Sequence, residues 1–131
     1  MILLDTNVLI DLDSVWLDPA QSYVASALSR AELELGVRRA PTLAEREIRQ
    51  ARLAALDALF DWLPFDRAAS TGYGIVAGST ALTGVRLRSK DALIAGQAMS
   101  QGLTIMTRNT ADYLPFAQHV TVVAPLPLEV G

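Results

Sequence analysis

Residues 1–11 read MILLDTNVLID. The change from apolar to polar residues inside this stretch decides the fold. Residues 2–4 form a short apolar run that is typical of a buried strand. Asp5 follows this run directly, with a threonine and an asparagine behind it. A carboxylate at this position either caps the next helix or serves a binding site at the edge of a sheet.

The composition limits the chemistry available to the chain. Its 131 residues are enough for one domain with a sizeable core. It contains no cysteine and a single histidine, His119, which excludes disulfides, thiolate catalysis and zinc sites built from cysteine or histidine. Any bound metal ion must therefore be held by oxygen. The net charge of -3 argues against a protein that simply coats nucleic acid, because phosphate binding is mainly electrostatic.

The sequence gives no sign of export or of a membrane span. Its first residues lack the basic segment and apolar stretch of a secretory signal. Residues 68–85 have the length of a membrane span, but glycines and hydroxyl side chains interrupt them. We therefore expect a cytoplasmic protein without membrane contact.

Short apolar runs alternate with segments of helical periodicity along the chain. The segments between the runs are too long for hairpins, so they indicate a mainly parallel sheet covered by helices on both faces. The prediction is an α/β fold in a single domain, residues 1–131, with about four to five strands. Strands are expected at 2–4, 23–26, 103–106 and 120–123, and helices through 8–12, from a Ser29 cap to Gly36, from Leu43 to Pro64, from an Asp66 cap to Gly84, from a Ser89 cap to Gly102, and as a turn at 112–116.

Four acidic residues fall where this architecture can bring them together. In parallel sheets, ligands bind beyond the carboxyl ends of the strands. Each acid also has a structural explanation, as a helix cap, a capping-box residue or a partner of a helix dipole. The four are Asp5 after the first strand, Glu32 on the helix after the second, Asp91 in the turn after Ser89, and Asp112 after strand 103–106.

Taken together, the four acids indicate a metal ion. Two carboxylates about 4 Å apart repel each other by on the order of 4 kcal/mol at an effective dielectric constant of about 20, so a converging cluster needs a cation. Oxygen ligands without histidine or cysteine favour Mg²⁺ or Mn²⁺, which commonly work with a phosphate-bearing substrate. The expected chemistry therefore takes place on a phosphodiester or phosphoryl group.

Four segments carry these acids: DTNVLID (5–11), VASALSRAELELG (24–36), KDALIAGQA (90–98) and TRNTADY (107–113). In this order and spacing, the chain from residue 1 to about 123 resembles PIN-domain ribonucleases, in particular VapC-type toxins of toxin–antitoxin pairs. The resemblance implies that Asp5, Asp91 and Asp112 are catalytic and surround Mg²⁺ or Mn²⁺. It assigns Glu32 a place in the same site, directly or through a water. It also implies supporting hydrogen bonds from Thr6, Asn7, Thr107 and Asn109.

The implied activity is metal-assisted hydrolysis of RNA by an endoribonuclease, which leaves a 5′-phosphate and a 3′-hydroxyl. The implied partners are an RNA substrate, a VapB-like antitoxin that inhibits the enzyme, and a second copy of the chain, in a homodimer and a toxin–antitoxin hetero-oligomer. Tyr113 stands where many relatives have phenylalanine, which is a conservative departure. The basic residues that flank the expected site are candidates for contacts with RNA phosphates: Arg86, Arg88, Lys90 and Arg108.

Other functions compete with this interpretation. A catalytically silent PIN-type module that binds RNA or protein has the same fold, but silent copies typically lose acids and this chain keeps all four. A phosphatase with an aspartyl intermediate needs a second aspartate two residues after the first, where this chain has Asn7. A relaxed dinucleotide fingerprint at Gly72, Gly74 and Gly78 lacks the strand that should precede it, so Gly72 and Gly74 are expected to allow close helix packing.

Overall fold

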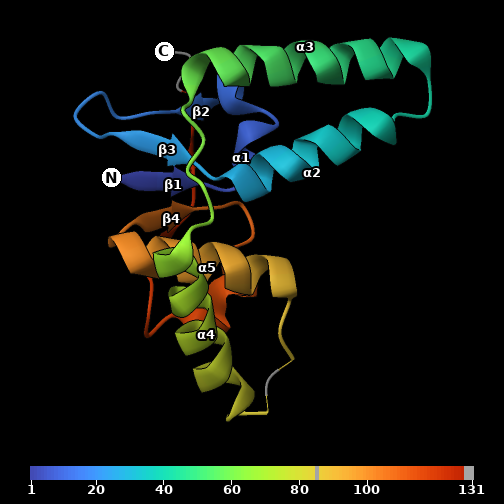
Figure 1. Ribbon diagram of the computed structural model, residues 1–131. Helices are drawn as coiled ribbons and strands as arrows, with labels where there is room; N and C mark the ends of the chain where they lie inside the picture. The colour runs from blue at the N-terminus through green and yellow to red at the C-terminus, as the bar shows by residue number, and fades with distance from the viewer. Residues whose placement is uncertain (85, 129–131) are drawn as a thin grey trace.

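The computed structural model describes residues 1–84 and 86–128, so Val85 and the last three residues of the predicted domain lie outside it. Its centre is a four-stranded sheet in the order β3-β1-β4-β5, and every pair in it is parallel (Figure 1). β1 aligns with both neighbours, so that Leu4 lies opposite Ala25 and Met106. The predicted α/β class and parallel sheet are confirmed. The strands are β1 (Ile2–Leu4), β3 (Tyr23–Ala25), β4 (Thr104–Met106) and β5 (Val122–Val123).

Helices connect these strands, and a small antiparallel pair, which the sequence did not predict, lies apart from the main sheet. Across the described residues, none of the helices is both long and apolar enough to cross a membrane. The helices are α1 (Thr6–Leu9), η1 (Leu12–Ser14), α2 (Ala27–Arg38), α3 (Leu43–Leu59), α4 (Arg67–Ala81), α5 (Ser89–Gln101) and η2 (Thr110–Phe116), and the antiparallel pair is β2 (Val15–Trp16) with β6 (Leu126–Pro127).

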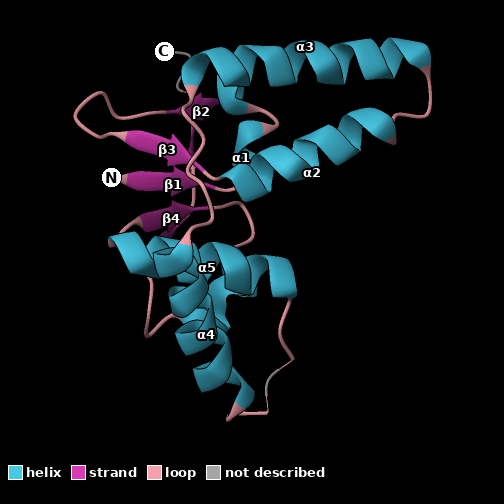
Figure 2. Ribbon diagram, in the orientation of Figure 1, coloured by secondary structure: helices cyan, strands magenta, loops and turns pink. Residues whose placement is uncertain are grey.

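The central sheet separates two hydrophobic cores, because successive side chains of a strand point to opposite faces. Leu3 and Ile105 belong to the core under α4, α5 and η2. Leu4 and Met106 belong to the core under α1, α2 and α3. Figures 1 and 2 show α4 and α5 on one side of the strands and the paired helices α2 and α3 on the other. The prediction of helices on both faces is therefore confirmed.

The start of α2 differs from the prediction. Ser26, at the end of β3, is the N-cap and accepts a hydrogen bond from the Leu28 backbone, whereas Ser29 is buried inside the helix. Glu32 is therefore not part of a capping box at the helix start. The helix also continues past Gly36 to Arg38, because a single glycine costs a helix only about 1 kcal/mol.

Two other helix boundaries differ from the prediction. α3 ends at Leu59 because the following residues run beside β3: the Leu63 N–H donates to the Ala25 carbonyl at 2.8 Å, and the Ala27 N–H donates to the Leu63 carbonyl at 2.9 Å. At α5 the N-cap position belongs to Arg88, and Ser89 is the first helical residue. The predicted Ser89 cap is therefore wrong by one residue.

α4 and α5 cross with their backbones in contact. A Cβ atom added to Gly72 would overlap the carbonyl oxygen of Gly96, and one added to Gly96 would overlap the backbone of Tyr73. The predicted role in close packing is thus confirmed for Gly72. It is wrong for Gly74, which has open space where a Cβ would be.

The Gly72→Ala variant should unfold at lower urea concentration, because the added methyl group forces apart two backbones that cannot relax locally. We expect a loss of about 1–3 kcal/mol in the free energy of unfolding. Gly74→Ala is the matched control in the same helix, and we expect it to gain about 0.5–1 kcal/mol, since alanine is the better helix former. Equal effects of the two substitutions would contradict the packing described here.

Candidate functional site

Asp5 lies at the carboxyl end of the central strand β1. Its backbone N–H donates to the Met106 carbonyl at 2.9 Å, which continues the pairing of β1 with β4 by one residue. Its side chain is only 2% exposed, and Oδ1 accepts a hydrogen bond from the Thr6 N–H at 2.8 Å. Asp5 is therefore the N-cap of α1 and also a buried carboxylate at the edge where ligands bind in parallel sheets.

The second oxygen of Asp5 is surrounded by donors from other parts of the chain. Oδ2 accepts from the Thr107 hydroxyl at 2.9 Å and from the Tyr113 hydroxyl at 3.0 Å. The Asn7 amide lies at 3.5 Å from the same oxygen. Because a buried carboxylate without donors is costly, these contacts fix its position and its rotation.

The direction of these hydrogen bonds is determined by the backbone after β4. The Arg108 N–H donates to Asn7 Oδ1 at 2.9 Å, so the amide nitrogen of Asn7 faces Thr107 Oγ1 at 3.0 Å. The Asn109 N–H also donates to Thr107 Oγ1, at 3.2 Å. Since this oxygen accepts two hydrogen bonds, its own proton is left for Asp5. Asn7 and Thr107 thus lie where a supporting role predicts, whereas Asn109 contributes its backbone and its side chain is exposed.

Tyr113 is the member of this network that the sequence analysis missed. It lies on η2 and is 1% exposed, and its hydroxyl points to Asp5. Burial, together with the negative charge of Asp5 and Asp91, raises the pKa of Tyr113 far above its usual range, so the hydroxyl remains a donor. The sequence analysis noted the tyrosine in place of phenylalanine and assigned its hydroxyl no role.

Asp91 brings a second buried carboxylate to the same edge from the first turn of α5. It is 5% exposed, and burial raises its pKa; the charges of Asp5 and Asp112 raise it further, while Lys90 and Arg88 oppose the shift. Within the described part of the chain, no hydrogen bond or ion pair involves its carboxylate. Asp91 is therefore near enough to Asp5 and to Asp112 for their charges to raise its pKa.

The two outer acids are paired with cations. Lys90 Nζ lies 3.0 Å from Glu32 Oε2, and the Thr6 hydroxyl donates to Glu32 Oε1 at 3.2 Å. Burial alone would lower the pKa of Lys90, but the hydrogen bond to Glu32 and the attraction of Asp5 and Asp91 raise it. Asp112 faces solvent beside Arg88, whose guanidinium lies 3.2 Å away.

The remaining basic residues predicted to contact RNA take different positions. Arg108 pairs with Asp11 at 2.9 Å and so lies on the side of η1. Arg86 lines an open surface hollow of about 190 Å³ together with Arg88 and Asp112. Thus Arg86, Arg88 and Lys90 border the acids, whereas Arg108 reaches them only through its backbone bond to Asn7.

The family model for the PIN domain matches residues 2–114, a span that contains all four acids. The chain belongs to the PIN-domain family. It is 32% identical over 126 residues to the VapC ribonuclease Y4jK of Sinorhizobium fredii, a match that covers 86% of this chain and 90% of that protein. It is 31% identical over 138 residues to the toxin FitB of Neisseria gonorrhoeae, covering 95% and 98% of the two chains.

Two solved structures share the fold. FitAcB from Neisseria gonorrhoeae superimposes with a TM-score of 0.78 at 27% identity and covers 93% of this chain and 96% of that one. VapBC-5 from Mycobacterium tuberculosis, a member of the VapBC family of toxin–antitoxin systems, gives a TM-score of 0.76 at 30% identity over 93% and 94%. The predicted resemblance to VapC-type PIN domains is confirmed.

The oxygen ligands of this PIN domain fit a hard divalent cation. Among the described residues, no three Asp, Glu or His side chains converge into a ready-made ligand set. Mg²⁺ does not require one, because it usually keeps several waters and binds through one or two carboxylates. Asp5 and Asp91 supply two such carboxylates, both buried and mutually repelling. The pair is therefore the core of the candidate site.

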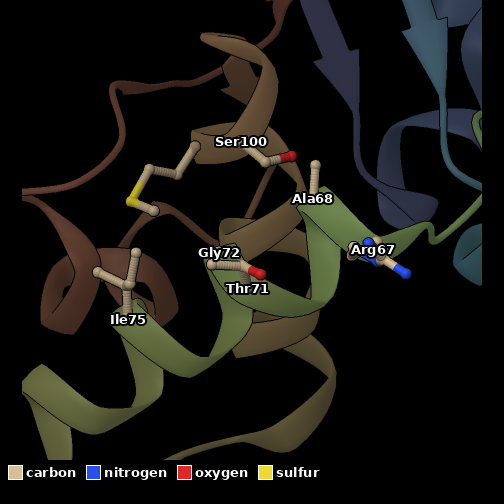
Figure 3. A pocket seen from close by; sticks show the side chains of 7 residues that line it. Arg67, Ala68, Thr71, Gly72, Ile75 and Ser100 are labelled. Atoms are coloured by element: carbon tan, nitrogen blue, oxygen red, sulfur yellow. The ribbon is translucent and has the colours of Figure 1, made fainter.

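A second hollow of about 370 Å³ lies elsewhere on the PIN domain, between α4 and α5 (Figure 3). Its lining residues include Gly72, Ile75 and Ser100 and no acid. Ser100 is near the C-terminal end of α5, whereas Asp91 is in its first turn. This hollow is consequently separate from the carboxylates.

The Thr107→Val variant should destabilise the PIN domain by about 1–3 kcal/mol, because Asp5 Oδ2 loses a donor and the Asn7 amide loses an acceptor. Chemical denaturation measures the change. Thr104→Val, on the strand that ends just before Thr107, is the matched control, and we expect it to change stability by less than about 0.5 kcal/mol. Equal losses of stability in the two variants would show that the hydrogen bonds of the Thr107 hydroxyl contribute nothing particular to the stability of the domain.

The Asp91→Asn variant should stabilise the metal-free PIN domain at neutral pH. The pKa of Asp91 is raised in the folded state above its ordinary value of 3.8, so ionised Asp91 opposes folding once the pH exceeds both values. We expect a gain of about 0.5–2 kcal/mol near neutral pH that disappears as the pH falls toward about 4. Thermal unfolding in EDTA across this range measures it, and a variant less stable than the wild type at neutral pH would contradict the electrostatic description.

Proposed function

We propose that this PIN domain is a metal-dependent endoribonuclease toxin that hydrolyses phosphodiester bonds in RNA. The observation that carries the proposal is the buried pair Asp5 and Asp91 at the carboxyl end of a parallel sheet, where the charge of Asp5 helps to raise the pKa of Asp91. The relatives named VapC ribonuclease and toxin FitB support RNA as the substrate and toxicity as the biological role.

Each acid has a proposed role at a bound Mg²⁺ or Mn²⁺. Asp5 and Asp91 would hold the ion, and Asp112 and Glu32 would complete the site, directly or through a water. When bound, the ion supplies positive charge that activates a water and stabilises the oxygens that become negative during hydrolysis. Thr6, Asn7 and Thr107 keep the carboxylates in place through their hydrogen bonds. The backbone of Asn109 supports Thr107 in turn.

The basic residues at this edge are suited to bind the RNA backbone. In this structure Lys90 pairs with Glu32, and Arg88 pairs with Asp112. Both cations extend to the surface. With these carboxylates turned toward a bound ion, the two cations would be free to contact phosphate oxygens. Arg86 borders the same surface, and Arg108 lies further along it, beside Asp11.

We also propose that a VapB-like antitoxin covers this site and inhibits the enzyme. The support comes from the solved VapBC-5 structure, which is described as a toxin–antitoxin system and matches over 93% of this chain. FitAB bound to a DNA fragment also matches, with a TM-score of 0.78 at 26% identity. A homodimer within a larger toxin–antitoxin hetero-oligomer is the proposed assembly.

A catalytically silent module that binds RNA or protein is the second candidate. The observation that favours it is the pairing of Glu32 with Lys90 and of Asp112 with Arg88, which neutralises two of the four acids without a metal. In this case the chain would bind RNA or a partner and cleave nothing. The phosphatase alternative loses support, because Asn7 is engaged with Thr107 and Arg108.

Cleavage of total RNA tests the proposal. The wild type should cut RNA with Mg²⁺ and not with EDTA. Asp5→Asn and Asp91→Asn should each lower the rate at least about 100-fold, because each removes a ligand charge. Asp61→Asn changes an exposed aspartate outside the site and should leave the rate unchanged.

Two outcomes would contradict the proposal. Equal cleavage by wild type and Asp5→Asn, after a contaminating nuclease has been excluded, would remove Asp5 from the site. Binding of RNA without cleavage by wild type in Mg²⁺ or Mn²⁺ would favour the silent module.

A further inference from the structure

We propose that the Tyr113 hydroxyl is a positioning group that leaves Asp5 a single oxygen for a metal ion, and that it thereby makes the site prefer Mg²⁺ over Ca²⁺. The inference rests on the proposed metal site at Asp5 and Asp91. It deepens that proposal by assigning a role to a residue outside the four acidic positions.

The first step concerns the number of acceptor positions on Asp5. A carboxylate oxygen has two lone pairs. At Oδ2, the Thr107 hydroxyl at 2.9 Å and the Tyr113 hydroxyl at 3.0 Å occupy both of them, with the Asn7 amide at 3.5 Å beside them. This oxygen has no capacity left for a cation.

The other oxygen of Asp5, Oδ1, accepts fewer hydrogen bonds. In the part of the chain that the structure describes, Oδ1 accepts one hydrogen bond, from the Thr6 N–H at 2.8 Å. One lone pair therefore remains for a ligand. Asp5 is thus prepared to bind a cation through Oδ1 alone.

The arrangement is also rigid. The Tyr113 ring is 1% exposed and packs edge-on against Phe116, with ring centroids 6.2 Å apart and planes at 71°. The hydroxyl cannot swing away without disturbing the core under α5. Rotating the carboxylate to present both oxygens would break the bonds from Tyr113 and Thr107 together.

Single-oxygen binding discriminates between the two cations. Mg²⁺ demands near-ideal octahedral geometry and takes carboxylate oxygens singly, whereas Ca²⁺ has longer bonds and accepts both oxygens of one carboxylate. A phenylalanine at position 113 keeps the packing but frees a lone pair on Oδ2. The two-oxygen contact that suits Ca²⁺ then becomes available.

Calorimetric titration of Mg²⁺ and Ca²⁺ into the metal-free protein, without RNA, tests this inference. Tyr113→Phe should raise the affinity for Ca²⁺ relative to that for Mg²⁺ by roughly threefold to tenfold, the range that one hydrogen bond represents. Tyr73→Phe removes a hydroxyl from α4 and should leave the ratio at the wild-type value. Thr107→Val removes the other donor to Oδ2 and should shift the ratio in the same direction as Tyr113→Phe, which provides a second variant if the first folds poorly.

The outcomes separate this inference from the proposed function. An unchanged ratio in Tyr113→Phe, or a parallel loss of both affinities, would overturn the positioning role and leave the nuclease proposal intact. Absence of divalent-ion binding by the wild type, or equal binding by Asp5→Asn, would overturn the metal site and this inference with it.

Discussion

Burial of the Asp5 carboxylate at the end of the central strand is the constraint on which the site depends. A buried carboxylate needs hydrogen-bond donors, and here they come from three separate segments: Thr6 on α1, Thr107 after β4 and Tyr113 on η2. The backbone of Asp5 is meanwhile bonded to Met106 on β4. The same residue therefore ties the sheet, the first helix and the last helical turn together, so stability and site geometry are coupled at one side chain.

Asp91, the second buried carboxylate, has surroundings unlike those of Asp5. Asp91 is brought close to Asp5 without donors of its own in the described chain, and the repulsion is offset only by neighbouring Lys90 and Arg88. These cations are partly exposed, so salt weakens their effect. The protein therefore keeps a local electrostatic cost at Asp91 that a bound cation would relieve.

The parts of the structure that could be predicted from sequence are those with a local signal. The apolar runs before Asp5 and before Thr107 identify two central strands, and the acids beside them identify one edge of the sheet. The end of α3 could not be predicted, because it depends on Leu63 pairing with Ala25. The Lys90–Glu32 pair could not be predicted from sequence either, since its members are 58 positions apart. The role of Tyr113 depends on a hydroxyl that hydrophobic periodicity cannot distinguish from phenylalanine.

The backbone contact between Gly72 and Gly96 holds α5 against α4 at one point. Gly96 lies five residues from Asp91, which is about 7.5 Å along the helix. A helix held at one point can still tilt about it, and even a small tilt displaces a carboxylate at that distance. A residue change that alters how α4 packs on α5 would therefore shift Asp91 relative to Asp5 while both carboxylates stay chemically the same.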